Sequence, residues 1–438
     1  RPCEPACRHG GEGLGEPVAI CFSKRSAADF LAEPEPVVLP PHFSATGRRV
    51  AVVGAGASGL AAARELARCG HAVTVLEKHD RPGGMMVQGI PAFRLPRAVV
   101  EREIEQIRRQ GVEIRCGVAV GRDVTLEGLL AEYDAVIVAA GTHRTSIPAV
   151  PGHELAGVRH GLDFLREANA TGRAPMGRRV AVIGGGFTAV DCARMARRLG
   201  AEQVTVCYRR SEAEMYITPG EVEEMRHEGI GFHAQVSPLR LNGEGGAVAS
   251  LTLVRTQPGP VGPDGRRSFV EDRGAEATLP CDTVLFATGQ QAERVGPEQE
   301  SPKLFTAGDY ATGALSLIDA IAHGKACARR VDEFLIGRRR LGEAAHITEA
   351  RGTGRTRELD ALPRQAMPAL PVAERALAAE VETGFDPAAA RTEAQRCYLC
   401  HFKYEIDNDL CIYCDRCLKV KPVEGCIVKV SAQTHDEQ

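Results

Sequence analysis

Two glycine-rich segments have the spacing of loops that bind the pyrophosphate of a dinucleotide. The first, Gly54-x-Gly56-x-x-Gly59, directly follows a short β-branched run and opens an expected helix. Its glycines permit a tight turn and a close approach of the backbone to phosphate, and the helix N-terminus supplies N–H donors. Glu77 ends the next expected strand, where a carboxylate can bind ribose hydroxyls. This segment therefore predicts a dinucleotide site.

The second segment runs from Gly184 to Ala189 and also follows an expected strand and begins a helix. Its third small position is Ala189, which still lets the helix pack closely on the strand. After the next strand come Arg209 and Arg210, where an acidic residue would indicate NAD. Guanidinium groups at this point can bind a ribose 2′-phosphate, which favours NADP. The alternative is that both arginines are merely solvated.

Cysteines form the third group of residues that could do chemistry. Six of the fifteen lie between residues 397 and 426. The spacing Cys411-x-x-Cys414-x-x-Cys417 is typical of thiolates that bind a [4Fe–4S] cluster in bacterial ferredoxins. There the next ligand is a cysteine before a proline, whereas here Lys421 precedes the proline. Because an ammonium group cannot ligate iron as a thiolate does, the pattern predicts one cluster.

The fourth ligand of this cluster stays open among three further cysteines: Cys397, Cys400 and Cys426. The alternative is a zinc site of four cysteines, for instance Cys397, Cys400, Cys411 and Cys414. Short-spaced cysteines on a chain this long favour metal ligands in a reducing cytoplasm over the disulfides of a secreted scaffold. We therefore expect a cytoplasmic protein with a metal-binding tail.

Composition excludes several other classes of function. The 438 residues are 44% hydrophobic and 25% charged, which is ordinary for a globular protein, and the net charge is only -3. Nothing here indicates a nucleic acid or an acidic membrane surface as partner. No apolar run is long enough to span a bilayer, and no signal-peptide pattern is present. Because the chain starts at Arg1 rather than Met, we expect a truncated N-terminus.

The elements that must position the two glycine loops alternate between strand and helix. Expected strands lie at residues 49–53, 72–76, 135–138, 180–183, 204–207 and 283–286. Expected helices follow the loops at 58–69 and 188–199. Such alternation predicts right-handed βαβ units in parallel sheets. The expected fold class is α/β, with two Rossmann-like nucleotide-binding domains and a small C-terminal cysteine-rich, ferredoxin-like module.

With both loops identified, the chain resembles the glutamate synthase small-subunit family of flavin oxidoreductases, which includes the flavin half of dihydropyrimidine dehydrogenase. The resemblance extends from about Cys3 to about Arg330 and is most specific in the stretch 89–96, Gly-Ile-Pro-Ala-Phe-Arg-Leu-Pro. It implies FAD in the first lobe and NAD(P) in the second, with hydride passing between nicotinamide C4 and flavin N5. That transfer requires positioning rather than a protein acid or base, so we expect no catalytic residue.

The motifs and the resemblance together give the candidate cofactor-binding residues. One group surrounds the first loop and the later segment 308–320, where the chain is expected to return to the first lobe. It comprises Gly54, Gly56, Ala57, Ser58, Gly59, Glu77, Lys78, Gly83, Gly84, Met85, Ile90, Pro91, Arg94, Ala140, Gly141, Thr142, Gly308, Asp309, Ser316, Leu317 and Ala320. Around the second loop they are Gly184, Gly186, Phe187, Thr188, Ala189, Arg209, Arg210, Thr288 and Gly289.

Two departures limit what the resemblance implies. The family's N-terminal domain holds iron–sulfur clusters on a larger cysteine set, of which only Cys3 and Cys7 stand here. Lys24 occupies the position of a Gln or Glu in relatives, so we do not expect N-terminal clusters. Neither lobe contains Cys-x-x-Cys, which argues against a thioredoxin-reductase-like enzyme, and the isolated Cys192 is expected to be a small buried residue.

The expected domain boundaries follow from these motifs. Residues 1–45 would be the remnant of an N-terminal iron–sulfur-type region, 46–145 with 285–335 the FAD domain, 146–284 the NAD(P) domain, 336–395 a linker and 396–431 the cysteine-rich module. We expect at most one helix in the linker, around residues 373–382.

A flavin beside a cluster converts hydride into single electrons. The predicted function is therefore an FAD-containing electron-transfer subunit between NAD(P)(H) and the iron–sulfur centres of a partner oxidoreductase. The expected partner is a tungsten or molybdenum aldehyde or formate oxidoreductase, a hydrogenase or a ferredoxin, and the resemblance slightly favours the aldehyde type. The alternatives are a scaffold subunit that holds FAD structurally and a stand-alone NAD(P)H:ferredoxin oxidoreductase. The direction of electron flow stays open.

Overall fold

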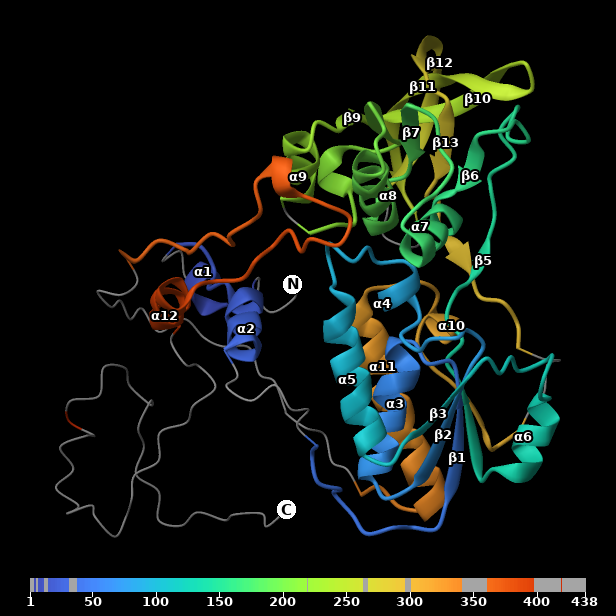
Figure 1. Ribbon diagram of the computed structural model, residues 1–438, viewed down its shortest axis with the longest axis vertical. Helices are drawn as coiled ribbons and strands as arrows, with labels where there is room; N and C mark the ends of the chain where they lie inside the picture. Colours follow the sequence, from blue (N-terminus) through green and yellow to red (C-terminus); the bar gives the residue numbers. More distant parts are fainter. Residues whose placement is uncertain are drawn as a thin grey trace. The chain divides into compact units, whose positions relative to one another are not determined.

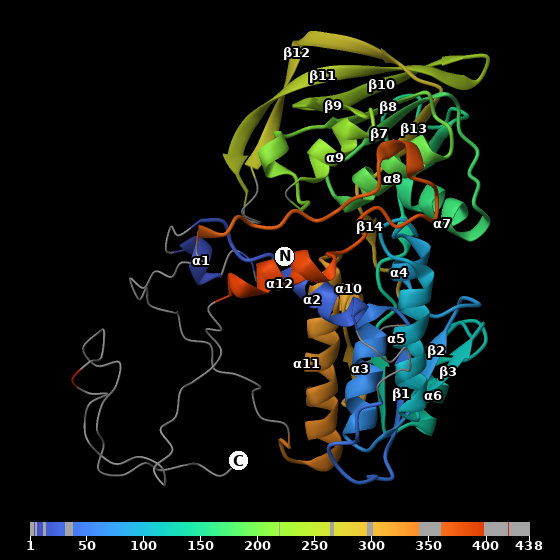
Figure 2. The ribbon, with the colours of Figure 1, turned by 60° about the vertical axis from the view of Figure 1, so that its left-hand side comes forward.

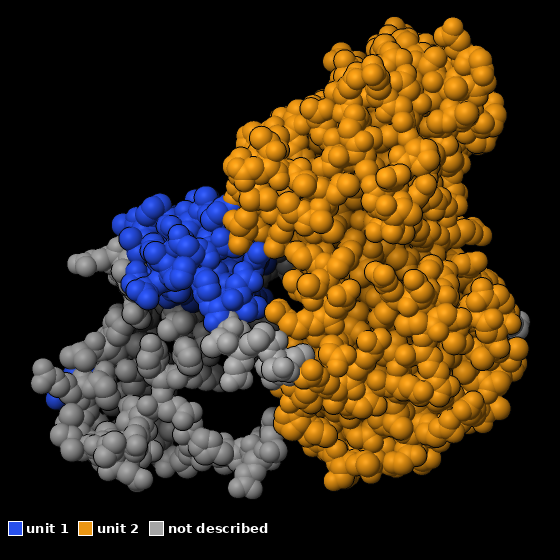
Figure 3. Space-filling model, in the orientation of Figure 1, with its two compact units in different colours: residues 1–32, 345–368, 384–438 blue, residues 33–344, 369–383 orange. Residues whose placement is uncertain are grey.

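The computed structural model describes residues 4, 7–11, 15–30, 38–218, 220–262, 267–295, 301–340, 361–397 and 419. The chain divides into two compact units, coloured separately in Figure 3. The larger unit comprises Glu33–Ala344 and Ala369–Thr383, and it contains both glycine loops. The smaller unit comprises Arg1–Ala32, Ala345–Pro368 and Gly384–Gln438.

The first lobe of the larger unit is built on a five-stranded parallel sheet. Its strand order is β15 (Leu304–Thr306), β4 (Ala135–Val138), β1 (Arg49–Val53), β2 (Ala72–Glu77) and β3 (Glu113–Cys116). Successive side chains of β1 enter opposite cores, as the period of a strand requires. One face is covered by α3 (Ala57–Arg68), α5 (Arg97–Arg109) and α11 (Leu317–Ile336), as Figure 1 shows, and the other by α6 (Leu126–Glu132).

The second lobe repeats this plan. Its parallel sheet has the order β6 (Val158–His160), β13 (Thr283–Phe286), β7 (Arg179–Ile183), β8 (Gln203–Tyr208) and β9 (Gly231–Ala234). One face packs on α7 (Gly161–Thr171) and α8 (Phe187–Arg198), next to α9 (Glu221–His227). The chain crosses between the lobes where β5 (Arg144–Thr145) pairs antiparallel with β14 (Gln290–Gln291). Two Rossmann-like domains are therefore confirmed.

A three-stranded antiparallel sheet that the sequence did not predict covers the other face of the second lobe. It consists of β10 (Val236–Glu244), β11 (Ala247–Val261) and β12 (Arg267–Pro280). Leucines of β10 and β11 pack on Ala181, Ile183 and Phe286 of the parallel sheet. In both ribbon views the sheet lies on the side of β7–β9 away from α8 (Figures 1 and 2).

Two expectations about boundaries need correction. β13 pairs along its whole length with β6 and β7, so a domain boundary at residue 285 cuts through a strand of the second sheet. The expected helix at 373–382 is wrong, since that stretch contains only a short 3₁₀ turn, Val372–Glu374. Among the described residues after 361, an α-helix is formed instead by α12 (Pro387–Gln395). It begins where Asp386 accepts hydrogen bonds from two backbone N–H groups and Pro387 starts the first turn.

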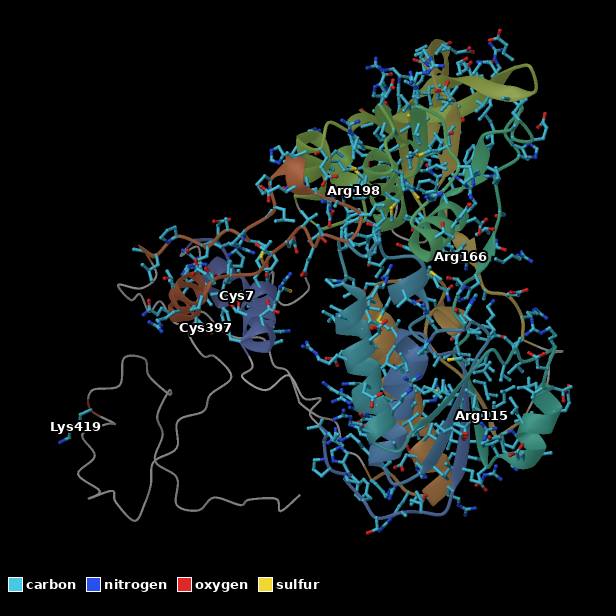
Figure 4. All side chains as sticks on the ribbon, in the orientation of Figure 1. Cys7, Arg115, Arg166, Arg198, Cys397 and Lys419 are labelled. Carbon is cyan, nitrogen blue, oxygen red and sulfur yellow. The ribbon has the colours of Figure 1, made fainter. Side chains whose placement is uncertain are left out.

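In the smaller unit, residues from the beginning of the chain pack against residues from its last part. α2 (Ile20–Asp29) lies against α12, and the Ala19 N–H donates to the Glu393 carboxylate at 2.7 Å. Cys7, just before α1 (Arg8–Gly11), and Cys397, just after α12, both belong to this unit and are labelled in Figure 4. No described helix combines the length and apolar character needed to cross a bilayer.

Candidate functional site

A single cavity of about 1610 Å³ in the larger unit is lined by both glycine loops. The first loop ends β1 and begins α3, and the second ends β7 and begins α8. The carboxyl ends of parallel strands with following helix N-termini are the usual place for a nucleotide in such folds. All but five of the predicted cofactor residues line this cavity; the exceptions are Gly59, Gly83, Pro91, Ala189 and Gly308.

The glycines of the first loop differ in what they tolerate. Gly54 has φ +104°, and a β-carbon there would lie 2.5 Å from the Ala139 carbonyl oxygen. A β-carbon at Gly59 would lie 2.0 Å from the Gly54 carbonyl oxygen, so Gly59 is required for packing α3 on β1. At Gly56 only the Gly84 Cα lies within 4 Å, at 3.9 Å. Gly56 therefore leaves open space at the helix N-terminus for a ligand.

Glu77 stabilises the same loop from the end of β2. Its Oε2 accepts a hydrogen bond from the Ala55 N–H at 2.8 Å, and its Oε1 accepts one from the His79 N–H at 3.0 Å. The side chain lies on the cavity wall and is largely buried. A carboxylate fixed in this way is positioned to accept hydrogen bonds from ribose hydroxyls.

The returning segment places a second motif against the first loop. Gly308 has φ +63°, and a β-carbon there would lie 2.5 Å from the Ser58 β-carbon. Asp309 Oδ1 and Ser58 Oγ are buried, and neither has a hydrogen-bond partner among the described residues. Buried polar atoms normally find partners, so these two point to a polar ligand between the motifs. The arrangement fits the phosphate and ribityl part of FAD.

The N-terminus of α11 supplies an apolar wall to the cavity. Ser316 caps the helix by accepting a hydrogen bond from the Asp319 N–H, while Asp319 accepts bonds from the Ser316 N–H and hydroxyl. Next to this cap, Leu315, Leu317 and Ile318 are 54%, 39% and 55% exposed. Exposed apolar side chains gathered on a cavity wall are typical of a ligand-binding surface. A flat isoalloxazine ring fits this surface.

In the second loop, as in the first, some glycines are required by close neighbours and one leaves open space. A β-carbon at Gly184 would lie 2.5 Å from the Ala287 carbonyl oxygen, and one at Gly185 would lie 2.3 Å from the Tyr208 ring. At Gly186, which caps α8, a β-carbon would meet nothing within 4 Å. Phe187, the first residue of α8, is 37% exposed and lines the cavity. The open position therefore again lies at the helix N-terminus, where a second pyrophosphate fits.

A charge network joins the specific 89–96 stretch of the first lobe to the second lobe. Arg94 Nη2 lies 2.6 Å from Glu221 Oε1, and Arg94 Nη1 lies 3.2 Å from Asp191 Oδ1. The second contact lacks hydrogen-bond geometry, so Asp191 Oδ1 has no hydrogen-bond partner among the described residues. Burial raises the pKa of Asp191 to about 6, against the opposing charge of Arg94. Sequence reasoning missed Asp191 and Glu221, because only the fold brings them to Arg94.

Cys192 is fully buried on α8, as the sequence predicted, and its thiol donates to the Gly161 carbonyl at 3.4 Å. In the described ranges no three His, Cys, Asp or Glu side chains gather as metal ligands would. Of the predicted metal ligands only Cys397 is described. The others lie outside the described residues, as do Cys3 and Lys421: Cys400, Cys411, Cys414, Cys417 and Cys426. The metal site therefore stays a prediction.

Comparison of the sequence with known families agrees with this geometry. Residues 48–313 match the family described as pyridine nucleotide-disulphide oxidoreductase. The chain is 36% identical to the NADP(+)-dependent formate dehydrogenase subunit beta of Moorella thermoacetica, over 91% of this chain and 64% of the relative. It is 39% identical to the NADPH-Fe(3+) oxidoreductase subunit beta of Geobacter sulfurreducens, over 67% of this chain and 44% of the relative. The chain thus spans less than two thirds of the length of these two relatives.

A further relative is matched over more of its own length. The glutamate synthase [NADPH] small chain of Escherichia coli is 34% identical over 66% of this chain and 69% of the relative. Among solved structures, FprA of Mycobacterium tuberculosis in complex with NADPH has a TM-score of 0.59 at 20% identity, covering 66% of this chain and 85% of FprA. That likeness shows the two-dinucleotide fold. The chain therefore belongs to the pyridine nucleotide-disulphide oxidoreductase family and is related to the glutamate synthase small chain.

Proposed function

We propose that this chain is an FAD-containing electron-transfer subunit that moves electrons between NADP(H) and the iron–sulfur centres of a partner oxidoreductase. The observation that carries the proposal is the single cavity lined by two pyrophosphate-type loops, at Gly56 and Gly186. When bound there, FAD would exchange hydride with nicotinamide and single electrons with a cluster. The residues of the chain bind, orient and enclose the two nucleotides.

FAD would be held by the lobe made of residues 46–145 and the segment after β13. Backbone N–H groups at the start of α3 would donate to its pyrophosphate, and Glu77 would accept hydrogen bonds from ribose hydroxyls. Ser58 and Asp309 would use their unpartnered oxygens on the same cofactor. The exposed leucines before and at the start of α11 would cover the ring.

NADP(H) would be held by the second lobe. The N-terminus of α8 would bind its pyrophosphate, and Arg209 and Arg210, which line the cavity, would bind the 2′-phosphate. The names of the relatives, two of them NADPH-linked and one NADP(+)-dependent, support NADP over NAD.

Electrons would leave through a [4Fe–4S] cluster on Cys411, Cys414 and Cys417, in a module at 396–431. Zinc on the same cysteines stays the alternative. The likeness to a formate dehydrogenase subunit supports a formate oxidoreductase as partner, in place of the aldehyde type that the sequence favoured. We place this complex in the cytoplasm on the strength of the clustered cysteines.

The test is the transfer of electrons from NADPH to a one-electron acceptor dye by the purified chain under anaerobic conditions. We expect bound FAD after purification and steady reduction of the dye with NADPH. Dye reduction by the parent that is lost in Gly186→Val would support the proposal. If the purified protein contains FAD but NADPH supports no dye reduction, the chain would be a scaffold and the proposal would fail.

A further inference from the structure

All three strands of the antiparallel sheet β10–β12 contribute residues to the wall of the nucleotide cavity, and β12 contributes its first residue, Arg267. We infer that Arg267 adds a third guanidinium to the 2′-phosphate site and is a specificity-determining residue for NADP(H). The inference rests on the proposed function, because it names how the second lobe recognises its nucleotide. The antiparallel sheet β10–β12, which is not part of the βαβ units of either lobe, would then take part in nucleotide binding.

Hydrogen bonds from this sheet hold the turn that carries Arg209 and Arg210. The Thr256 hydroxyl on β11 donates to the Arg209 carbonyl at 2.8 Å. The N–H of Gln235, the residue before β10, donates to the Arg210 carbonyl at 3.1 Å. Gln235 has φ +56°, the only non-glycine residue with positive φ among those described, and such strained backbone is kept where surrounding contacts require it. The sheet therefore fixes the position of the turn.

The side chains of the turn are also held by β12. Arg210 Nε donates to the Arg267 carbonyl at 2.7 Å, and the Arg209 guanidinium lies 4.8 Å from the centre of the Phe269 ring. The first contact uses one N–H of the Arg210 guanidinium, which keeps further N–H groups of Arg210 for an anion. Arg267 itself is exposed and lines the same cavity.

The charges of this corner of the cavity match a phosphate. Glu214, which also lines the cavity, has its pKa lowered by hydrogen bonds from the Ser211 hydroxyl and N–H, and further by the charges of Arg210 and Arg267. The positive charges of Arg210 and Arg267 therefore both act on the Glu214 carboxylate. Arg210 and Arg267 bring positive charge to this part of the cavity, which suits the roughly −1.5 to −2 charge of a phosphate monoester.

The experiment compares adenosine 2′,5′-bisphosphate with adenosine 5′-monophosphate, which differ only in the 2′-phosphate, by calorimetric titration of the flavin-loaded full chain. Arg267→Gln keeps the backbone carbonyl that Arg210 uses and removes only the charge. We expect it to weaken the bisphosphate by about tenfold or more and to leave the monophosphate unchanged. Arg273→Gln is the matched control, since Arg273 is an exposed arginine of the same strand that does not line the cavity.

The outcomes separate the inference from the proposed function. A parent protein that prefers the bisphosphate, with Arg267→Gln behaving like Arg273→Gln, would overturn the inference and leave the proposed function standing. A parent that binds both probes equally would overturn the NADP preference and the inference together. Equal weakening of both probes in Arg267→Gln, at an unchanged melting temperature, would also overturn the 2′-phosphate assignment.

Discussion

At the scale of single residues, the glycines of the loops divide into those that the fold needs and those that a ligand needs. Gly54 and Gly59 would place a β-carbon within 2.5 Å of backbone oxygens, whereas Gly56 and Gly186 face open space. Sequence spacing alone predicts all four but cannot separate these roles, because the neighbours of each β-carbon are set by tertiary structure.

Replacing Gly186 with valine should therefore act on the nucleotide and not on the fold. Nothing lies within 4 Å of a β-carbon at this position, and its φ of -110° suits any residue. We expect Gly186→Val to keep its FAD and to weaken NADP binding by at least about tenfold, because the side chain would occupy the path of the pyrophosphate. Gly184→Val is the contrasting control, since its side chain would meet the Ala287 carbonyl and destabilise the lobe. Binding by titration and melting temperature together check both.

Asp191 should make stability depend on pH. Its folded-state pKa of about 6 is above that of an unfolded aspartate, so the unfolded chain ionises first as pH rises. Stability should then fall as pH rises from about 4 to about 6, by about 3 kcal/mol at most. Asp191→Asn should flatten this part of the curve, as measured by urea unfolding at several pH values. The same slope in both proteins would contradict the assignment.

At the scale of elements, the six central parallel strands were predictable because each is a short apolar run that is almost wholly buried. The four edge strands of the two sheets, β3, β6, β9 and β15, were not predicted, because they are short and partly exposed. The sheet β10–β12 was not predicted either, because β11 and β12 contain exposed polar residues, and β11 includes Pro258 and Pro260. Its strands are defined by pairing with each other and by packing on the second sheet, which no local pattern records. The sequence likewise placed both glycine loops correctly but missed the Arg94–Asp191–Glu221 contacts.

The segment 369–383, which the sequence described as linker, is part of the nucleotide-binding unit. Its Val381 N–H donates to the Phe93 carbonyl at 3.0 Å, and Leu377 and Val381 pack in the core of the second lobe. Composition suggested a linker because residues 337–395 are rich in Arg, Ala, Glu and Pro and show no strand pattern, yet a few apolar side chains hold the segment 369–383 in place.

Arg375 is the contact of this segment that mutation can test. Its Nη1 lies 2.9 Å from Glu224 Oε2 and 2.7 Å from Glu228 Oε1, and the side chain is 7% exposed. We expect Arg375→Ala to lower the free energy of unfolding by about 1–3 kcal/mol. Arg226→Ala is the control, because its ion pair with Glu212 is exposed to solvent and should contribute little to stability. If Arg375→Ala and Arg226→Ala lowered the free energy of urea unfolding equally, the contacts of Arg375 with Glu224 and Glu228 would not hold the segment 369–383 in place.

At the scale of the whole molecule, the proposed route of electrons ends in the cysteine-rich tail. Metal analysis of anaerobically purified protein should find about four irons per chain, with a signal that reduction changes. Replacing Cys414 with serine should remove the iron and leave the FAD and its reaction with NADPH intact, since these belong to the larger unit. Zinc in place of iron would contradict the route and make the tail a structural module.

In the proposed mechanism the two loops hold FAD and NADP(H) in one cavity so that hydride passes between them. Anaerobic titration of the flavin absorption with NADPH tests it most directly, because neither a partner subunit nor the cysteine tail is required. We predict that the oxidised flavin band bleaches with about one NADPH per flavin and that Gly186→Val needs a large excess. A flavin band that stays oxidised at excess NADPH in the parent protein would contradict the account.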